Sequence, residues 1–189
     1  MNSFIIIVEG QDRTGKDTIV KSIIRKYFDK TIIPIHCIGP GSESKNPLEE
    51  SKKFYKDLLF HISLSNPNVN FILNRSHIGE MVYSPLYRGY NGDYVLELEK
   101  KFITSSKICG CGKSKKTLLI VLVDSSNQNM ERDDNDSLAN NKKQSNEELS
   151  LFKEAFNKSS ISQKVFIDIK NKNISEVKEE VLNFLKGHL

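Results

Sequence analysis

The stretch Phe4-Ile5-Ile6-Ile7-Val8-Glu9-Gly10-Gln11-Asp12-Arg13-Thr14-Gly15-Lys16-Asp17-Thr18 decides the fold of this chain. An apolar run of strand length leads into a Gly-x-x-x-x-Gly-Lys segment, and a helical amphipathic pattern follows at once. This order is typical of a loop that binds phosphate. The glycines let backbone amides point inward at an anion, the helix N-terminus adds partial positive charge, and Lys16 reaches the terminal phosphates. An ordinary strand, turn and helix is the alternative, and it leaves the position of Lys16 unexplained.

Length and composition fit one domain spanning residues 1–189. Charged residues make up 28% and hydrophobic residues 38% of the 189, enough for a sizeable core. No apolar run approaches membrane-spanning length, and Met1 leads directly into the first apolar run, so we expect a cytoplasmic protein without a membrane partner. The formal charge of +4 is mild, which suits a phosphate-rich small substrate better than a nucleic-acid surface.

The three cysteines do not form a disulfide framework. Cys109 and Cys111 have the spacing of half a metal site, but no second Cys/His pair lies at a suitable distance, so we interpret them and Cys37 as reduced thiols. The segment Gly110-Cys111-Gly112-Lys113-Ser114 imitates a phosphate loop. It precedes a predicted strand instead of following one, and Lys107 stands where the first glycine belongs. We therefore assign no phosphate site to it.

Apolar runs alternate with helical periodicity along the whole chain. Several runs are continuously apolar, as in strands that are buried on both faces. We predict strands at 4–9, 31–37, 69–74, 117–124 and 164–169, and helices with apolar faces within 19–27, 48–62, 94–102, 149–156 and 174–185. Repeated strand-helix units with right-handed crossovers give an α/β fold, in which helices flank a parallel five-stranded sheet. The site then lies at the carboxyl ends of the strands.

Segment 125–148 breaks this pattern. Its only apolar residues are Met130, Leu138 and Ala139. A plain surface loop is one interpretation, but the position between the fourth strand and a late helix favours a mobile lid over a nucleotide.

The first motif resembles the phosphate loop of the thymidylate kinases. Residues 9–16 read Glu-Gly-Gln-Asp-Arg-Thr-Gly-Lys, where the eukaryotic type has Glu-Gly-Leu-Asp-Arg-Thr-Gly-Lys. Leu73-Asn74-Arg75-Ser76, followed by Tyr83-Ser84, resembles that family's Asp-Arg-Tyr motif and its downstream Ala-Tyr-Ser. The resemblance covers nearly the whole chain. It implies a P-loop NTPase fold like that of nucleoside monophosphate kinases, a mobile lid, ATP and Mg²⁺ as cofactors, small nucleotide substrates and, by analogy, a homodimer.

The resemblance also implies which residues act on ATP. Phosphoryl transfer depends mainly on positioning and on neutralising the charge of the moving group. Lys16 supplies one cation, and Arg13 lies inside the loop, where it can swing toward the transferring phosphate. The predicted lid has Arg132 as its only arginine, and in this family the loop carries an arginine when the lid does not. A solvated loop cation is the alternative for Arg13. The predicted ATP-binding residues are Gly10, Gln11, Asp12, Arg13, Thr14, Gly15, Lys16, Asp17 and Thr18.

A second group of residues is expected to bind the acceptor sugar and phosphate. Asp12 reads the sugar 3′-hydroxyl in the resembled family, although here it can also cap a loop amide. Arg75 closes the third strand, where its guanidinium can grip an acceptor phosphate bidentately or form a structural salt bridge. Together with Arg13 and Lys16, it is a catalytic candidate. Tyr83 either walls off the 2′ face of the sugar or belongs to the core, and Arg88 either adds an anion contact or lies at the surface.

The base-binding pattern departs from the family. Phe60, in Leu58-Leu59-Phe60-His61-Ile62-Ser63-Leu64, matches the aromatic residue that stacks on the base, with a core residue as the alternative. Leu64 stands where the family has an arginine for the base edge. Ile38-Gly39-Pro40-Gly41 lacks the cation of the family's Arg-Glu-Pro-Gly. The sequence therefore leaves the base open.

Two further departures concern the metal. Asp17 follows the loop lysine where Ser or Thr normally binds Mg²⁺, and Asn74 replaces the usual aspartate at the end of the third strand. Our hypothesis is that Asp17 supplies the charge that Asn74 lacks. Glu9 is the other candidate carboxylate, and Asp124 ends the fourth strand.

These patterns predict ATP-dependent phosphorylation of a deoxynucleoside monophosphate, with dTMP to dTDP as the first choice. A deoxynucleoside kinase is the alternative, because those related enzymes carry Glu-Arg-Ser where this chain has Asn74-Arg75-Ser76. Their general base usually follows the second strand, and the candidates there are His36, Glu43, Glu49 and Glu50. A third interpretation is a nucleotide-binding protein of the same fold whose catalysis is weakened, for which Asn74 and the missing base-edge arginine are the support.

Overall fold

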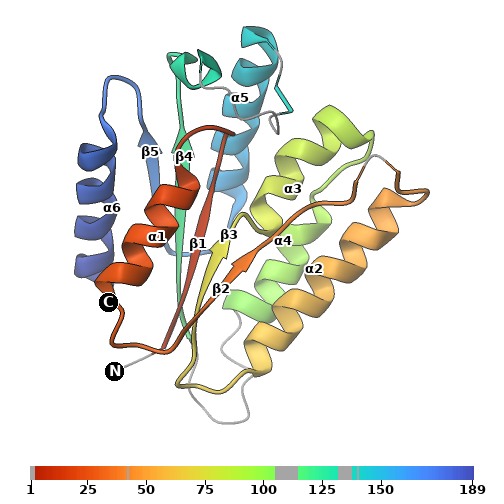
Figure 1. Ribbon diagram of the computed structural model, residues 1–189. Coiled ribbons are helices and arrows are strands. Elements are labelled where there is room, and N and C mark those ends of the chain that lie inside the picture. Colours follow the sequence, from red (N-terminus) through yellow and green to blue (C-terminus); the bar gives the residue numbers. More distant parts are fainter. Residues whose placement is uncertain (1–2, 42, 105–114, 132–137, 140) are drawn as a thin grey trace.

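The buried apolar run at the start of the chain forms the central strand of the sheet. A computed structural model describes residues 3–41, 43–104, 115–131, 138–139 and 141–189. Cys109, Cys111, the 110–114 segment and Arg132 lie outside the described residues. Every residue of β1 (Phe4–Gly10) is buried, and the strand pairs in parallel with β3 (Asn70–Asn74) on one side and β4 (Lys116–Val123) on the other. The edges are β2 (Ile32–His36) and β5 (Gln163–Asp168), which gives the order β2-β3-β1-β4-β5 (Figure 1). All four pairings are parallel, so the predicted sheet is confirmed.

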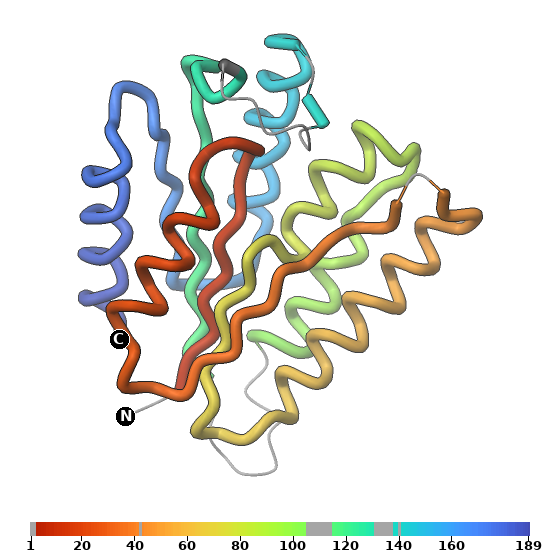
Figure 2. Tube along the Cα trace, viewed as in Figure 1, coloured from red at the N-terminus to blue at the C-terminus, as the bar shows by residue number. Residues whose placement is uncertain are grey.

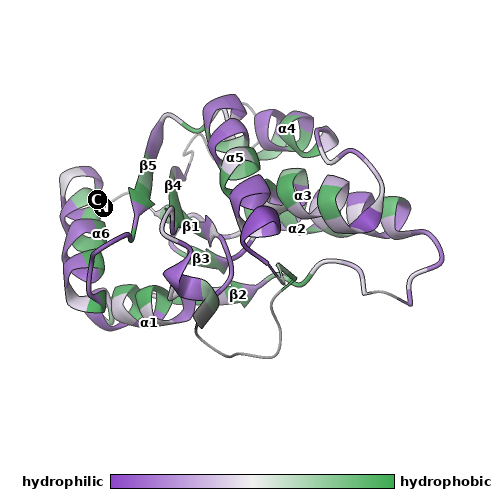
Figure 3. Cartoon of the chain, turned by 90° about the horizontal axis from the view of Figure 1, so that it is seen from above, coloured by the Kyte–Doolittle hydropathy of each residue, from purple (hydrophilic) through white to green (hydrophobic). Residues whose placement is uncertain are grey.

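Helices cover both faces of this sheet. They are α1 (Lys16–Lys26), α2 (Pro47–Leu64), α3 (His77–Tyr83), α4 (Tyr94–Glu99), α5 (Lys142–Lys158) and α6 (Ile174–His188). Short helical turns add η1 (Ser84–Arg88), η2 (Lys100–Thr104) and η3 (Gln128–Glu131). Viewed from above, α1 and α6 lie on one side of the sheet and α2 to α5 on the other (Figure 3). None of the helices in the described ranges has the length and apolarity that a bilayer span requires.

The alternation of side chains along the strands divides the core in two. Phe4, Ile6 and Val8 pack with α1 and α6, whereas Ile5 and Ile7 pack with the helices of the other layer. Because both faces of β1 are covered, the strand is apolar at consecutive positions rather than at alternate ones. The same alternation decides which polar residues at the strand ends can meet.

Two features differ from the sequence-based expectation. Helix α3 was not predicted as a separate element, because all its residues from His77 to Tyr83 are buried and no amphipathic stripe marks it. The predicted lid at 125–148 is also too long. Helix α5 begins at Lys142, where the Asn141 side chain caps it by accepting from the Gln144 amide, so residues 142–148 are helical.

Candidate active site

The loop between β1 and α1 has the backbone geometry that a phosphate cradle requires. The loop lies at the carboxyl ends of the strands, whereas the C-terminus of the chain lies near their amino ends (Figure 2). Gly10 has φ +134°, and a Cβ placed on it would lie 1.8 Å from the Leu122 carbonyl oxygen, so no other residue fits. Gly15 has φ +87° and forms the left-handed entry to α1. The predicted strand, loop and helix are therefore present.

Lys16 lies over this loop. Its ammonium donates to the carbonyl oxygens of Gly10 at 2.9 Å and Gln11 at 2.5 Å, and lies 3.8 Å from the Asp12 carboxylate. The side chain is 5% exposed. Burial, followed by the positive charge of Arg75, lowers the pKa of Lys16 to about 8. A poorly solvated ammonium beside another cation is well placed to bind an anionic group.

Asp12 connects the loop to the end of β3. Its Oδ1 lies 2.8 Å from the Arg75 guanidinium, in a pair where Asp12 is buried and the Arg75 side chain is 34% exposed. Both Arg13 and Arg75 have φ +63°, a conformation that costs a non-glycine residue free energy and is found most often at functional sites. The structure thus brings together the predicted residues Asp12, Lys16 and Arg75.

The described part of the predicted lid contacts the loop directly. Arg13 Nη1 donates to the Met130 carbonyl oxygen at 3.1 Å, and the Asn129 side-chain amide donates to the Asp12 carbonyl oxygen at 2.9 Å. The Leu138 amide donates to Asp12 Oδ2 at 3.4 Å. Arg13 is therefore directed at the segment that follows β4.

Gln11 is the loop residue that departs from the resembled motif, and its side chain is fully buried. Nε2 donates to the carbonyl and hydroxyl oxygens of Ser145 at 2.7 and 3.0 Å, while Oε1 accepts from the Asp124 amide at 2.8 Å. One amide thereby fixes the loop to β4 and α5. Thr14 stabilises the loop from within, because its hydroxyl donates to the Gln11 carbonyl oxygen at 2.8 Å.

The two predicted metal carboxylates lie on opposite faces of the sheet. Asp17 is exposed in the first turn of α1 and accepts from the Asn74 side-chain amide at 2.5 Å. Glu9 follows Ile5 and Ile7 in the alternation of β1, so it faces the α2–α5 layer. Among the described residues, no three or more His, Cys, Asp or Glu side chains cluster as a metal site. The structure therefore places the two candidate metal ligands on different faces of the sheet, and metal binding by either carboxylate stays a prediction.

Glu9 is occupied by backbone donors. Its Oε1 accepts from the amides of Ser76 at 2.6 Å and Gly79 at 3.0 Å, which ties β1 to the start of α3. Complete burial raises the pKa of Glu9, although the two amides and the nearby Lys16 oppose that shift.

A buried carboxylate that the sequence analysis did not single out lies beside the loop. Glu148 is 1% exposed and accepts from the Tyr87 hydroxyl at 2.8 Å. Burial raises its pKa to about 7, the negative charge of Asp12 adds to the shift, and Lys16 and Arg75 oppose it. Its sequence signal is a charged residue one turn before Phe152 on the buried face of α5. The predicted lid assignment hid that helical position.

Tyr83 lies in the same region. Its hydroxyl donates to the Gly10 carbonyl oxygen at 3.3 Å, and its ring stacks on Tyr87 at a centroid distance of 6.1 Å. The ring is buried and also contacts Phe152, so Tyr83 is a core tyrosine whose polar end reaches the loop.

Arg88 is directed elsewhere. Its guanidinium pairs with the buried Glu80 at 2.6 Å, and Glu80 also accepts from the hydroxyls of Ser51 and Tyr90 at 2.5 Å each. A Cβ added to Gly39 would meet this guanidinium at 2.0 Å, so Arg88 covers the segment after β2. In this structure Arg88 is therefore the ion-pair partner of Glu80, and its contact with a substrate anion stays a prediction.

Phe60 is not brought to the loop. It lies near the C-terminal end of α2, 40% exposed, with an edge contact to Phe102 at 5.8 Å. That end of α2 leads into the start of β3, so Phe60 lies near the amino ends of the strands, whereas the loop lies at their carboxyl ends (Figure 1).

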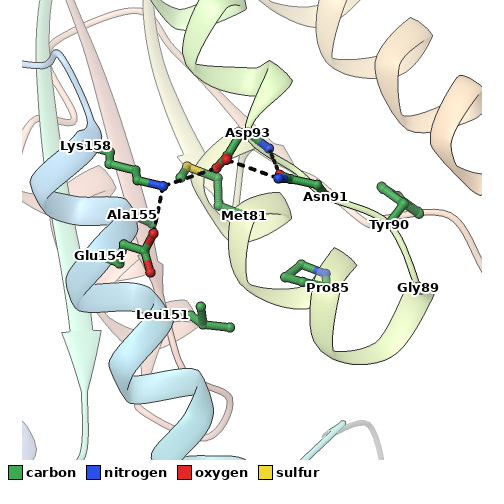
Figure 4. A pocket seen from close by; sticks show the side chains of 10 residues that line it. All are labelled: Met81, Pro85, Gly89, Tyr90, Asn91, Asp93, Leu151, Glu154, Ala155 and Lys158. Carbon is green, nitrogen blue, oxygen red and sulfur yellow. Dashed lines mark hydrogen bonds and ion pairs between the residues drawn. The ribbon is translucent and has the colours of Figure 1, made fainter.

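A pocket of about 460 Å³ lies between α5 and the segment that follows α3 (Figure 4). Met81, Pro85 and Leu151 line it, and an ion-paired Lys158 lies at its rim, 3.6 Å from Asp93 and 2.7 Å from Glu154. None of the predicted site residues lines this pocket, so it is separate from the loop.

The comparisons with known proteins identify the fold. No protein-family model matches the sequence, and no curated protein matches it. Thymidylate kinase from Candida albicans is 16% identical with a TM-score of 0.62, over 98% of this chain and 92% of that one. The YorR protein of Bacillus subtilis, in complex with phosphorylated GDP, is 18% identical with a TM-score of 0.58, over 96% and 95%. Deoxyadenosine kinase from M. mycoides, with dCMP and dCDP bound, is 15% identical with a TM-score of 0.54, over 97% and 99%. The chain therefore has the P-loop fold that it shares with this thymidylate kinase and this deoxyadenosine kinase, as its resemblance to the thymidylate kinases implied.

Proposed function

We propose that this protein is an ATP-dependent nucleotide kinase that transfers the γ-phosphoryl group of ATP to a deoxynucleoside monophosphate, with dTMP as the first acceptor to test. The observation that carries this proposal is the Asp12–Arg75 ion pair beside the phosphate loop. In this pair the partly exposed Arg75 guanidinium is oriented by the Asp12 carboxylate. Arg75 follows β3, and the neighbouring strand β1 leads into the loop that would hold the triphosphate. A guanidinium in that position suits the phosphate of an acceptor.

The loop residues perform the donor side of the reaction. The amides of residues 10–16 and the N-terminus of α1 bind the triphosphate, and Lys16 exchanges its two carbonyl contacts for phosphate oxygens. Arg13 exchanges the Met130 carbonyl for the transferring phosphoryl group. For each of these carbonyl contacts, a charged phosphate is a stronger partner than the carbonyl that it replaces.

Mg²⁺ would supply charge neutralisation on the β- and γ-phosphates. The residues at the start of α1 fit such an ion, because Asp17 offers an exposed carboxylate and the neighbouring Asn74 has a buried side-chain oxygen without a hydrogen-bond partner among the described residues. Magnesium is commonly held by one or two protein oxygens together with phosphates and waters. Asp17 and Asn74 together would supply two such protein oxygens.

A deoxynucleoside kinase is the second candidate, and the fold shared with M. mycoides deoxyadenosine kinase favours it. A nucleoside hydroxyl needs a general base, which in those enzymes usually follows the second strand. Glu43, Glu49 and Glu50 are exposed in this chain, and Glu49 pairs with Lys52 at the surface. A monophosphate acceptor needs no such base, and this difference places the second candidate behind the first.

We further propose that residues 1–189 work as one domain in the cytoplasm and that two copies associate as a homodimer. The single domain follows from length and composition, the cytoplasmic location is the expectation from the apolar pattern of the sequence, and the dimer comes from the resemblance alone. Light scattering of the purified protein tests the dimer, and limited proteolysis tests the single domain.

The test of the function is ATP consumption against a panel of nucleosides and nucleoside monophosphates, with Lys16→Ala as the inactive control. We expect turnover with deoxynucleoside monophosphates, highest with dTMP, and loss of turnover in the variant. Phosphorylation of nucleosides but not of monophosphates would overturn the first choice in favour of the second. A protein with weakened catalysis would instead show a melting temperature raised more by ATP and dTMP together than by either alone, without product.

A further inference from the structure

Three polar side chains from different elements meet on the α1 side of the sheet. His36 ends β2 and lies opposite Asn74 at the end of β3 in the parallel register. Their neighbours Ile35 and Leu73 pack into the α2–α5 layer, so His36 and Asn74 face the other way, toward Asp17 in the first turn of α1. The Asn74 amide nitrogen joins the three, because it donates to Asp17 Oδ1 at 2.5 Å and lies 3.1 Å from His36 Nδ1.

The oxygen of the same amide is the unusual atom. Asn74 is 7% exposed, and its Oδ1 is buried with no hydrogen-bond partner in the described part of the chain. Buried side-chain oxygens nearly always have a partner, so one without a donor requires an explanation. Asp17 and Asn74 are also the two departures that concern the metal in the motifs that the sequence resembles, and the structure places them in direct contact.

We propose that His36, Asn74 and Asp17 form a divalent cation site with one nitrogen and two oxygen donors, which prefers a first-row transition metal such as Mn²⁺ to Mg²⁺. The site deepens the proposed function, because it lies directly after the loop lysine. Mg²⁺ is a hard cation that takes oxygen ligands, whereas imidazole is a common ligand of transition metals. The histidine is thus the residue that sets the metal preference.

The geometry needs two local changes. Asp17 Oδ1 and His36 Nδ1 both lie within 3.1 Å of the Asn74 amide nitrogen, so the three side chains already meet at one point. A half-turn of the terminal amide, a torsion with a broad two-fold profile, replaces this nitrogen by Oδ1 and so turns a hydrogen-bond donor into a metal ligand. The exposed side chains of Asp17 and His36 then move outward and admit the cation between the three donor atoms. Before this rotation the amide oxygen of Asn74 lacks a hydrogen-bond partner among the described residues, and after it the amide nitrogen does, so the number of unpaired buried atoms does not rise. His36 and Asp17 are exposed, which leaves room for water to complete the coordination shell.

The test measures metal binding to the full chain without nucleotide. Titrations with Mn²⁺ and with Mg²⁺ are compared for the wild type, for His36→Gln, and for His61→Gln as the matched control. His61 is likewise an exposed histidine, but it lies on α2 beside Phe60. We expect His36→Gln to weaken Mn²⁺ binding by about 10-fold or more and Mg²⁺ binding by less than about 2-fold, while His61→Gln changes neither.

A spectroscopic measurement detects the nitrogen ligand itself. Electron spin echo envelope modulation of bound Mn²⁺ should show coupling to a ¹⁴N nucleus in the wild type and in His61→Gln, and none in His36→Gln. Equal Mn²⁺ affinity in the wild type and His36→Gln, absence of the nitrogen coupling, or no Mn²⁺ binding at millimolar concentration would each overturn the proposal. Because no nucleotide is present, these outcomes do not depend on whether the protein transfers phosphate.

Discussion

The Asp12 carboxylate lies 2.8 Å from the Arg75 guanidinium, so a residue of the phosphate loop holds the residue that ends β3. Asp12 is also 3.8 Å from Lys16, which places one carboxylate between two cations. Binding of phosphates on either side of this carboxylate therefore changes the electrostatic environment of the other side. The donor and acceptor halves of the proposed site are coupled through a single side chain.

The first prediction concerns this coupling. Asp12→Asn keeps the shape of the side chain but removes the charge that orients Arg75. We expect the KM for the monophosphate acceptor to rise about 10-fold, with a smaller change in the KM for ATP, because a displaced guanidinium binds the acceptor phosphate less well. Initial rates at varied acceptor concentration measure this. Asp29→Asn, at an exposed position after α1, is the control, and an acceptor KM that stays at the wild-type value in Asp12→Asn contradicts the prediction.

The second prediction concerns Arg13. The hydrogen bond from Arg13 to the Met130 carbonyl oxygen directs the side chain at the segment after β4. Arg13 also has a positive φ, a backbone conformation that glycine would adopt with less strain. We expect Arg13→Ala to lower kcat by on the order of 10³-fold, the magnitude found for arginines that stabilise the transferring phosphoryl group, with an unchanged fold.

Steady-state kinetics and circular dichroism check this prediction. Arg25→Ala, in the exposed last turn of α1, is the matched control and should keep full activity. If Arg13→Ala retains near-normal kcat, the arginine is a surface cation of the loop and has no role in the transfer.

The third prediction concerns Gln11. Leucine occupies this position in the resembled loop and has nearly the same size, but Gln11→Leu removes three hydrogen bonds and leaves the buried Asp124 amide without its partner. We expect the free energy of unfolding to fall by about 2–4 kcal/mol. Urea denaturation measures it, with Gln128→Leu at an exposed position of η3 as the control. Equal midpoints for Gln11→Leu and the wild type would show that α5 is not fixed to the loop in this way.

Much of the fold could be predicted because its signals are local. The strands β1 and β4 are apolar at consecutive positions, and the loop glycines are required by positive φ values at Gly10 and Gly15. Helix α3 escaped prediction for the opposite reason. It is buried on every side, so its residues show no periodicity that separates a helix from a loop.

The site was predictable in part. Asp12, Lys16 and Arg75 belong to recognisable motifs, and the structure brings them together. Glu148 and His36 approach the loop only through packing of α5 and through the register between β2 and β3, which are long-range features. The separation of Glu9 from Asp17 follows from strand alternation, because β1 directs Glu9 away from α1. The partner of Arg88, in contrast, depends on where Glu80 lies in the unpredicted helix α3.

The last prediction concerns Glu148 and pH. Burial raises its pKa to about 7 in the folded protein, above the ordinary value of 4.5. The folded state therefore binds a proton that the unfolded chain releases between pH 4.5 and pH 7. The contribution of this group to stability is complete below pH 4.5 and is lost as the pH rises through 7, by an amount on the order of 3 kcal/mol.

Glu148→Gln isolates this effect, because glutamine is neutral at every pH and its side-chain oxygen can still accept from Tyr87. We expect the wild type to lose stability between pH 5 and pH 7.5 relative to Glu148→Gln, so that the variant is the more stable protein at pH 8. Denaturant unfolding at several pH values checks it. Glu147→Gln, at the exposed neighbouring position, should follow the wild type. Parallel pH profiles for the wild type and Glu148→Gln would mean that Glu148 is ionised in the folded protein at pH 6, held charged by Lys16 and Arg75.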